Sequence, residues 1–169
     1  MNNVKKKKKC KVILSVAGSD NSSGAGVQCD IKVASALSVY CVNCITMVTS
    51  QDSNGVKKIF ELPKEMILSQ LKTILNEFKV DGIKIGLISN VKSAESIVTL
   101  LKKKIKNIPI VVDPICKSTT NSLLVSKYDY LIINKILSKL SPIFTPNLTE
   151  IKTLLNLKNI DNISKEKLI

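Results

Sequence analysis

A short apolar segment that runs into a loop rich in glycine, serine and aspartate constrains the fold of this chain most strongly. Residues 12–17 read Val-Ile-Leu-Ser-Val-Ala, and residues 18–26 follow as Gly-Ser-Asp-Asn-Ser-Ser-Gly-Ala-Gly. Such a junction, with an amphipathic segment behind it, is typical of a strand that delivers a loop and a helix N-terminus to the edge of a parallel sheet. Unpaired backbone N–H groups and the helix dipole favour anions there, so we expect a phosphate or a polar small molecule as ligand.

Apolar runs alternate with helical periodicity along the rest of the chain. The pattern predicts strands at 12–17, 42–48, 80–85, 108–112 and 142–145, and a short extended segment at 56–62. Predicted helices comprise one with an apolar face of Val27, Ile31, Ala34 and Leu37, one starting near Pro63, one over 91–101, a largely helical stretch at 122–140, and a stripe over 148–155. This alternation predicts an α/β domain whose parallel sheet is covered by helices on both faces.

Length and composition indicate one domain. The chain has 169 residues and is 44% hydrophobic, which is enough apolar material for a core. We expect residues 1–10 to form a lysine-rich tail and residues 11–169 to form the domain. No apolar run reaches the length of a membrane span and no signal-peptide cleavage site follows the lysines, so we expect a cytoplasmic protein. Five cysteines, an odd number, argue against a disulfide framework.

The basic charge is made of lysine alone. The formal net charge is +13, and the chain contains neither arginine, histidine nor tryptophan. Bidentate base readout and most aromatic stacking are therefore missing, so we do not expect a nucleic-acid partner. The run Lys5–Lys9 is interpreted as a solvated tail, with contact to RNA or an anionic surface as the alternative.

The sequence lacks the motifs of several common catalytic and metal sites. The chain has no Gly-x-x-x-x-Gly-Lys phosphate loop, and without histidine it has no Ser-His or Cys-His pair. Cys41-Val-Asn-Cys44 is an isolated pair of cysteines that enters a predicted strand, so we expect neither a metal nor a redox site there.

Polar residues follow the predicted strands at several points. Because the carboxyl ends of parallel strands meet at one edge of a sheet, they predict a ligand site assembled from several loops. These residues are Gly18 and Asp20, Gln51 and Asp52, Gly86, Asp113, and Asn147 with Glu150. Two of the signals have a structural alternative. Asp113, which precedes Pro114, has the position of a turn or cap aspartate, and Asn147 with Glu150 has the spacing of a helix capping box.

The ordered set of these segments resembles the hydroxymethylpyrimidine and phosphomethylpyrimidine kinases of thiamine synthesis, members of the ribokinase-like superfamily. The resemblance extends over about residues 11–157. It rests on Val16-Ala-Gly-Ser-Asp-Asn-Ser-Ser-Gly-Ala-Gly-Val-Gln-Cys-Asp30, Ser35-Ala-Leu37, Ile45-Thr46 with Gln51, Lys84-Ile-Gly86, Val111-Val-Asp-Pro114 and Thr145-Pro-Asn-Leu-Thr-Glu150. It implies a three-layer α/β/α fold with a mostly parallel central sheet that is incomplete at its C-terminal side.

The resemblance also implies an activity and a set of site residues. The activity is ATP-dependent phosphorylation of 4-amino-5-hydroxymethyl-2-methylpyrimidine, with phosphorylation of its monophosphate as a second step. The implied pyrimidine-binding residues are Gly18, Asp20, Ala25, Thr49, Gln51, Leu87 and Ile115. The implied nucleotide-binding residues are Lys117, Asn147 and Glu150, and Asp113 and Glu150 are implied as Mg²⁺ ligands.

The sequence departs from the family pattern in several places. The family usually has Pro-Ser-Gly where this chain has Asn21-Ser-Ser23, an aliphatic residue at Thr49 and methionine at Leu87. A late Gly-Thr-Gly-Cys or Gly-Thr-Gly-Asp block is absent, and the last glycine is Gly86. The resemblance therefore places the catalytic base beyond Ile169, so no catalytic residue is assigned.

Three hypotheses follow from the resemblance and these departures. The first is that the chain is the N-terminal piece of a pyrimidine kinase whose remainder is encoded separately or lost, with a second copy of the chain or a separately encoded C-terminal fragment as the expected partner. Alternatively, it is a non-catalytic remnant that binds pyrimidine or a partner chain through an open sheet edge. The third hypothesis is a pyridoxal-type kinase, because pyridoxal kinases share the fold and some of the same segments.

Overall fold

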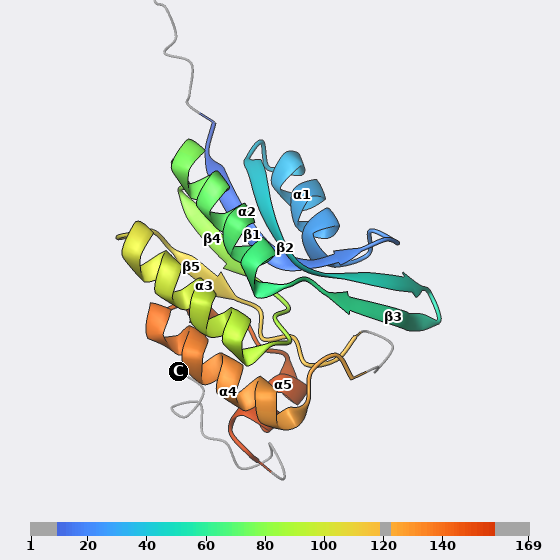
Figure 1. Ribbon diagram of the computed structural model, residues 1–169. Helices are drawn as coiled ribbons and strands as arrows, with labels where there is room; N and C mark the ends of the chain where they lie inside the picture. The colour runs from blue at the N-terminus through green and yellow to red at the C-terminus, as the bar shows by residue number, and fades with distance from the viewer. Residues whose placement is uncertain (1–9, 119–122, 158–169) are drawn as a thin grey trace, which may run out of the picture.

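The computed structural model describes residues 10–118 and 123–157, so the run Lys5–Lys9 lies outside the described residues. Its centre is a six-stranded sheet with the order β3-β2-β1-β4-β5-β6 (Figure 1). Neighbouring strands are parallel except β2 and β3, which form an antiparallel pair. The strands are β1 (Val12–Asp20), β2 (Tyr40–Asp52), β3 (Gly55–Glu61), β4 (Gly82–Ile85), β5 (Ile110–Val112) and β6 (Ile143–Phe144).

Helices connect these strands as the sequence pattern predicted. They are α1 (Gly26–Ala36), α2 (Lys64–Glu77), α3 (Val91–Lys104), α4 (Lys127–Leu137), which continues into a short 3₁₀ turn (Ser138–Leu140), and α5 (Leu148–Leu154). Helices α2, α3 and α4 lie side by side across one face of the sheet, and α1 packs against β1 and β2 (Figure 1). The chain thus has the mostly parallel α/β architecture that was expected.

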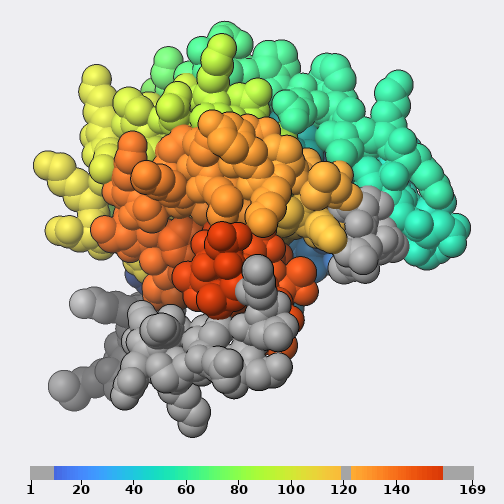
Figure 2. All heavy atoms as spheres, turned by 90° about the horizontal axis from the view of Figure 1, so that it is seen from below, coloured from blue at the N-terminus to red at the C-terminus, as the bar shows by residue number. Residues whose placement is uncertain are grey.

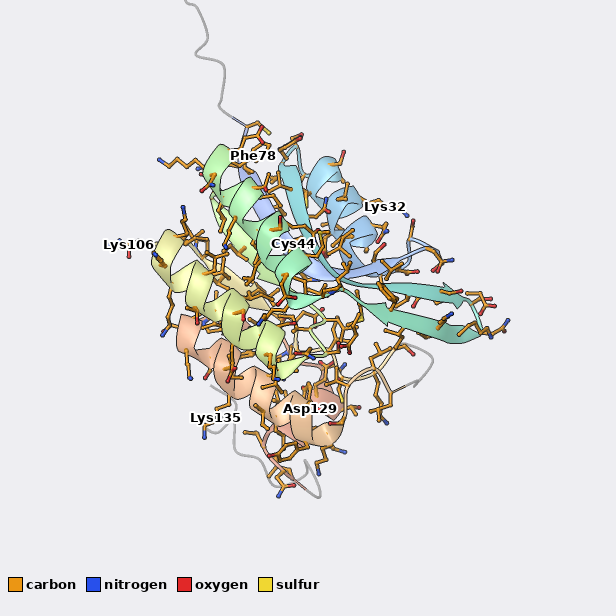
Figure 3. All side chains as sticks on the ribbon, in the orientation of Figure 1. Lys32, Cys44, Phe78, Lys106, Asp129 and Lys135 are labelled. Carbon is orange, nitrogen blue, oxygen red and sulfur yellow. The ribbon has the colours of Figure 1, made fainter. Side chains whose placement is uncertain are left out.

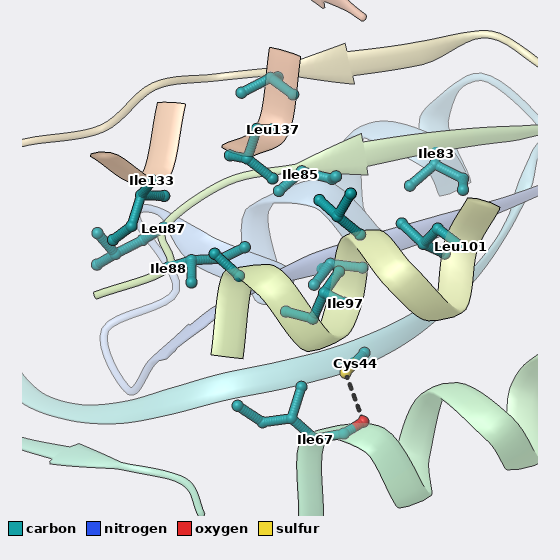
Figure 4. Close-up of a cluster of buried hydrophobic side chains, with 14 of the residues drawn as sticks. Cys44, Ile67, Ile83, Ile85, Leu87, Ile88, Ile97, Leu101, Ile133 and Leu137 are labelled. Atoms are coloured by element: carbon teal, nitrogen blue, oxygen red, sulfur yellow. Dashed lines mark hydrogen bonds between the residues drawn. The ribbon is translucent and has the colours of Figure 1, made fainter. Parts of the chain in front are cut away.

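The strand register shows which side chains share a face. Val16 pairs with Cys44, and the Cys44 thiol donates a hydrogen bond of 3.5 Å to the carbonyl oxygen of Ile67 on α2 (Figure 4). Ser15, the residue before Val16, faces the other way, and its hydroxyl donates to Asp30 on α1 at 2.5 Å. The main apolar core therefore lies between the sheet and the row α2–α4. Its fully buried members include Leu14, Val16, Ile85, Ile97, Leu101 and Leu137.

The same alternation separates the two cysteines of the Cys-x-x-Cys pair. Cys41 pairs with Ile13 and Cys44 with Val16, so the two thiols lie on opposite faces of the sheet. All five cysteines of the chain are free. The expectation that this pair forms no metal or redox site agrees with its placement.

The predicted apolar face of α1 needs correction. On α1, Val27 and Ala34 are buried, whereas Ile31 and Leu37 are 39% and 69% exposed. The helix makes its main contacts with β1 and β2, and Leu37 is the C-cap, beyond the last helical residue.

The stretch predicted to be largely helical, residues 122–140, contains α4 and the 3₁₀ turn that follows it. The Ser126 hydroxyl accepts a hydrogen bond from the Asp129 N–H and caps the start of α4. Residue 122 lies outside the described residues.

Many lysine side chains lie at the surface of this fold. Lys32, Lys106 and Lys135 are exposed and lie at the periphery of the molecule (Figure 3). Within residues 10–118 and 123–157, none of the helices combines the length and the apolar character that crossing a bilayer requires.

Candidate functional site

A pocket of about 310 Å³ opens beyond the carboxyl ends of the central strands. Every binding or metal-ligand residue implied by the family resemblance contributes to its lining. These residues are Gly18, Asp20, Ala25, Thr49, Gln51, Leu87, Asp113, Ile115, Lys117, Asn147 and Glu150. Asp52, predicted from its strand end, is instead exposed in the β2–β3 turn, where its carboxylate accepts a hydrogen bond from the Asn54 N–H. Gly86 also does not line the pocket.

The loop after β1 is organised around the carboxylate of Asp20. One oxygen accepts hydrogen bonds from the N–H and the hydroxyl of Ser22, at 2.8 and 2.7 Å. The other accepts from the N–H groups of Gly24 and Ala25, at 3.0 and 2.8 Å. Burial, the largest single influence, raises the pKa of Asp20, but these hydrogen bonds together outweigh it and leave the pKa below its ordinary value.

The sequence left a phosphate or a polar small molecule open as the ligand of this loop. The N–H groups of Gly24 and Ala25, which precede α1, already donate to the protein's own carboxylate. A second negative charge beside Asp20 is unfavourable. The loop therefore fits a polar, uncharged molecule better than a phosphate group.

Glycine is required at the close approach between the loop and β1. Gly26 has a φ of +61°, and a Cβ there would collide with the carbonyl oxygen of Gly18. Gln28, which the sequence did not single out as a site residue, holds the same junction. Its amide oxygen accepts from the Asp20 N–H at 2.9 Å, and its amide nitrogen donates to the Ser19 hydroxyl at 2.7 Å.

The walls of the pocket come from β2, β4 and the segment after β5. Thr49, where the family usually has an aliphatic residue, donates its hydroxyl to the Ser19 carbonyl oxygen at 3.0 Å, so that polar group is already satisfied. Leu87 is buried, and its carbonyl oxygen accepts from the Thr46 hydroxyl at 2.7 Å. The Gln51 backbone N–H donates to the Asn21 side-chain oxygen at 2.7 Å.

Two carboxylates border the opposite end of the pocket. Asp113 follows β5, and burial raises its pKa, an effect that Lys84 partly offsets. The turn after β5 is held by a backbone hydrogen bond, which the Ile115 N–H donates to the Asp113 carbonyl oxygen at 2.9 Å. Glu150 lies in the first turn of α5, and its pKa is raised by burial and by the charge of Asp113.

Asn147 and Glu150 form the capping box that their spacing allowed. The Asn147 side-chain oxygen accepts from the N–H groups of Thr149 and Glu150, both at 3.0 Å, and the Glu150 carboxylate accepts from the Asn147 N–H at 2.8 Å. The structural interpretation of this pair is therefore confirmed. Because both side chains also line the pocket, capping does not exclude a ligand role.

Lys84 is a pocket residue that the sequence analysis did not assign to the site. Its ammonium group lies 3.1 Å from both carboxylate oxygens of Asp30, which also accepts the hydroxyl of Ser15. A Cβ on Gly86 would lie 3.0 Å from the Lys84 nitrogen, so glycine leaves the space that the ammonium group occupies. A lone lysine within the apolar strand Gly82–Ile85 was the signal that could have identified it.

The two carboxylates fit a magnesium ion that is shared with phosphate groups. Among residues 10–118 and 123–157 there is no group of three His, Cys, Asp or Glu side chains that could hold a metal ion. Mg²⁺ commonly uses one or two carboxylates together with phosphate oxygens and water. Burial raises the pKa of both carboxyl groups, and the charge of Asp113 raises the pKa of Glu150 further, so a cation beside them would favour their ionised forms.

Comparisons with known proteins agree with this geometry. The family model for phosphomethylpyrimidine kinase matches residues 20–168. The chloroplastic thiamine biosynthetic bifunctional enzyme of Arabidopsis thaliana is 36% identical over 156 residues, which is 90% of this chain and 29% of that protein.

Solved structures of related kinases share the fold. The phosphomethylpyrimidine kinase of Clostridium difficile superposes with a TM-score of 0.79 at 34% identity, covering 89% of this chain and 66% of that one. The pyridoxal kinase of Staphylococcus aureus in complex with pyridoxal gives a TM-score of 0.78 at 26% identity, covering 95% of this chain and 57% of that one.

The match covers most of this chain but only part of the length of its relatives. This chain spans about half the length of the curated bacterial hydroxymethylpyrimidine/phosphomethylpyrimidine kinases, at 54% for the Mycobacterium tuberculosis protein and 56% for that of Aquifex aeolicus. The family model nevertheless matches most of the chain, from Asp20 at the end of β1 to residue 168. The ordered family segments, the pocket that they line and these comparisons together establish that the chain belongs to the phosphomethylpyrimidine kinase family.

Proposed function

We propose that this chain binds 4-amino-5-hydroxymethyl-2-methylpyrimidine and takes part in its ATP-dependent phosphorylation for thiamine diphosphate synthesis, with the monophosphate as a second substrate. The observation that carries the proposal is the gathering of all the family-matched residues, from five separate segments of sequence, around one pocket of about 310 Å³. A pocket of this volume suits a small, single-ring molecule.

The pyrimidine end of the pocket is assigned to the loop after β1 and to β2. The Gln51 amide both donates and accepts hydrogen bonds, as recognition of an aminopyrimidine edge requires. Gly18 and Ala25 offer backbone groups, and Asp20 keeps their loop in place next to the hydroxymethyl end. Leu87 and Ile115 supply apolar walls against the ring.

The phosphate end is assigned to the segments after β5 and β6. Lys117 lies on the pocket wall, where its ammonium group can pair with nucleotide phosphates. Asp113 and Glu150 would hold Mg²⁺, and Asn147 keeps the Glu150 turn in place through the capping box. When bound, Mg²⁺ supplies positive charge to the phosphate oxygens. The S. aureus pyridoxal kinase has been solved with ADP and with AMP-PCP, which supports nucleotide use within this fold.

We further propose that a second segment completes the transfer site. The 169 residues contain no Gly-Thr-Gly block, so the anion hole and the base that the family carries in that block are not among them. Phosphoryl transfer relies on positioning and charge stabilisation by such groups. A segment that carries such a block is the expected source of these groups.

The test measures binding and turnover separately. Calorimetry with the purified chain reports pyrimidine affinity, and ATP turnover with the pyrimidine and Mg²⁺ is followed with and without a C-terminal fragment that carries a Gly-Thr-Gly-Cys block. Binding by the chain with turnover only after fragment addition supports the proposal. Neither binding nor turnover would identify the chain as a non-catalytic remnant instead.

A pyridoxal-type kinase is the second candidate. The TM-score of 0.78 with the S. aureus pyridoxal kinase favours it, since that protein shares the fold nearly as closely as the pyrimidine kinase does. Competition between pyridoxal and the hydroxymethylpyrimidine for the same pocket separates the two candidates. Tighter binding of pyridoxal would overturn the pyrimidine assignment.

A further inference from the structure

Lys84 and Asp30 form a partly buried ion pair beside the pocket. The Lys84 and Asp30 side chains are 25% and 18% exposed, and the ammonium nitrogen contacts both carboxylate oxygens. The Ser15 hydroxyl, which is fully buried, donates to the same carboxylate. Desolvation offsets much of the attraction within such a pair, so stability alone is a weak reason for its presence.

The Lys84 side chain extends along β4 toward the carboxyl edge of the sheet. A Cβ on Gly86 would lie 3.0 Å from the Lys84 ammonium nitrogen and 3.6 Å from the carbon next to it. Gly86 is two residues further along the chain, and its N–H still bonds to β1 at the Val16 carbonyl oxygen. Residues two apart in a strand share a face, so the lysine stem passes over Gly86. The ammonium group thus reaches the edge where the pocket opens, which Figure 2 views with α4 and α5 in the foreground.

The ammonium group keeps a donor for a ligand. An ammonium group has three N–H donors, and within the described residues its hydrogen bonds go to the two oxygens of Asp30. Lys84 also lines the pocket of about 310 Å³, together with Ala17 and Asp113. The remaining N–H is therefore available to an acceptor atom within that pocket.

The register of the sheet places Lys84 between the two ends of the pocket. Lys84 pairs with Ser15 on β1 and with Val111 on β5. Strand β1 leads into the loop assigned to the pyrimidine, and β5 leads to Asp113 at the phosphate end. A pyrimidine bound at the first end must direct the group that is phosphorylated toward the second. That group is the hydroxymethyl substituent, so its oxygen is the acceptor expected near Lys84.

We propose that Lys84 is a substrate-binding residue whose ammonium group donates a hydrogen bond to the hydroxymethyl oxygen of the pyrimidine, while Asp30 holds the lysine in place. The inference rests on the proposed function and adds to it a residue for which the family resemblance implied no role. It also explains why a lysine occupies a strand whose other residues are glycine and isoleucine.

The chain offers a second lysine ion pair as a matched control. Lys84→Met removes the ammonium group and keeps most of the stem. Lys11→Met breaks the pair of Lys11 with Asp81, at 2.7 Å, which joins the residues just before β1 and β4 and does not line the pocket. Calorimetry of the whole chain measures the affinities for 4-amino-5-hydroxymethyl-2-methylpyrimidine and for 4-amino-2,5-dimethylpyrimidine, which lacks the hydroxyl.

The expected effect is selective for the ligand that carries the hydroxyl. We expect Lys84→Met to weaken binding of the hydroxymethylpyrimidine about tenfold, as for one lost hydrogen bond to a charged group, and to leave binding of the dimethylpyrimidine unchanged. Lys11→Met alters neither affinity. The unchanged chain binds the dimethylpyrimidine about tenfold more weakly than the hydroxymethylpyrimidine.

A double variant separates substrate binding from stability of the fold. Lys84→Met leaves the Asp30 carboxylate without its cation, whereas the combination with Asp30→Asn removes both charges. Thermal unfolding reports the stability of each variant, and the double variant is expected to show the same selective loss. Equal losses for both ligands, or equal affinity of the unchanged chain for the two, would overturn the inference alone. Failure of the unchanged chain to bind either pyrimidine would overturn it together with the proposed function.

Discussion

At the scale of single residues, Asp20 links the loop to the pocket through hydrogen bonds that act before any ligand binds. Its carboxylate accepts from the N–H groups of Ser22, Gly24 and Ala25. Loop conformation here thus depends on one ionised side chain. This is the reason that a conservative change at Asp20 is informative.

We predict that Asp20→Asn destabilises the fold by about 1–3 kcal/mol at neutral pH, because an amide offers one acceptor oxygen in place of two. The pKa of Asp20 in the folded chain lies below its ordinary value of 3.8, so its charge stabilises the fold fully above pH 3.8. This contribution is lost as the pH falls through the lowered pKa. Urea unfolding of both proteins at several pH values measures the difference, and a difference that grows on acidification would contradict the prediction.

Two glutamines with different positions test the pyrimidine assignment. Gln51 lines the pocket, whereas the Gln70 side chain bonds the backbone N–H and carbonyl oxygen of Ile45, both at 3.0 Å. We expect Gln51→Ala to weaken pyrimidine binding about tenfold with little change in Tm, and Gln70→Ala to lower Tm without weakening binding. Calorimetry and thermal unfolding measure the two effects. The assignment of Gln51 fails if both variants bind equally well.

At the scale of elements, the alternation along β2 separates side chains that are close in sequence. Cys41 is partly buried on the α1 side, and Cys44 is enclosed on the α2 side. Burial raises the pKa of Cys44 to about 12, so almost none of it is thiolate near neutral pH. The strand therefore controls reactivity as well as packing.

We predict that a thiol reagent at pH 8 modifies Cys10, which is exposed, long before Cys44. Cys44 becomes reactive only on unfolding, because its thiol is fully enclosed and remains protonated. Mass spectrometry of peptides after timed labelling measures both rates, and Cys10→Ser identifies the rapidly modified site. Similar labelling rates for Cys10 and Cys44 in the folded chain would show that β2 does not bury its α2 face.

At the scale of the whole molecule, the excess of positive charge lies outside the pocket. The net charge of +13 comes from lysines alone, and those on the helices lie at the surface (Figure 3). The pocket contains Asp20, Asp113 and Glu150 beside Lys84 and Lys117. The basic charge is therefore not a property of the pocket, and non-specific attraction of polyanions is its expected consequence.

We predict that the full chain binds single-stranded DNA weakly and without sequence preference, and that deletion of residues 1–9 lowers this affinity about tenfold at low salt. The segment removed carries Lys5–Lys9, whose contacts with phosphates release counterions. Fluorescence anisotropy at two salt concentrations measures binding, and pyrimidine affinity serves as the control that the domain is intact. Binding that survives high salt would point to a nucleic-acid site on the domain itself.

The sequence by itself determined the order of strands and helices along the chain and the segments that supply the pocket. Hydrophobic periodicity is local, and polar residues at strand ends converge wherever parallel strands share an edge. This is why Gly18, Gln51 and Asp113 could be assigned to one site before the sheet was known. The same local signals overestimated the buried face of α1, since they do not reveal how much of a helix the sheet covers.

Only the tertiary structure decided which side chains from different strands and helices contact one another. The pairing of Lys84 with Asp30 depends on the register between β1, β4 and α1, and the enclosure of the Tyr130 hydroxyl depends on α4 packing. The hydrogen bonds from the Gly24 and Ala25 N–H groups to Asp20 likewise form only when the loop folds back on itself. Such contacts join residues through space, and a one-dimensional pattern does not record the distances on which charge and hydrogen bonding depend.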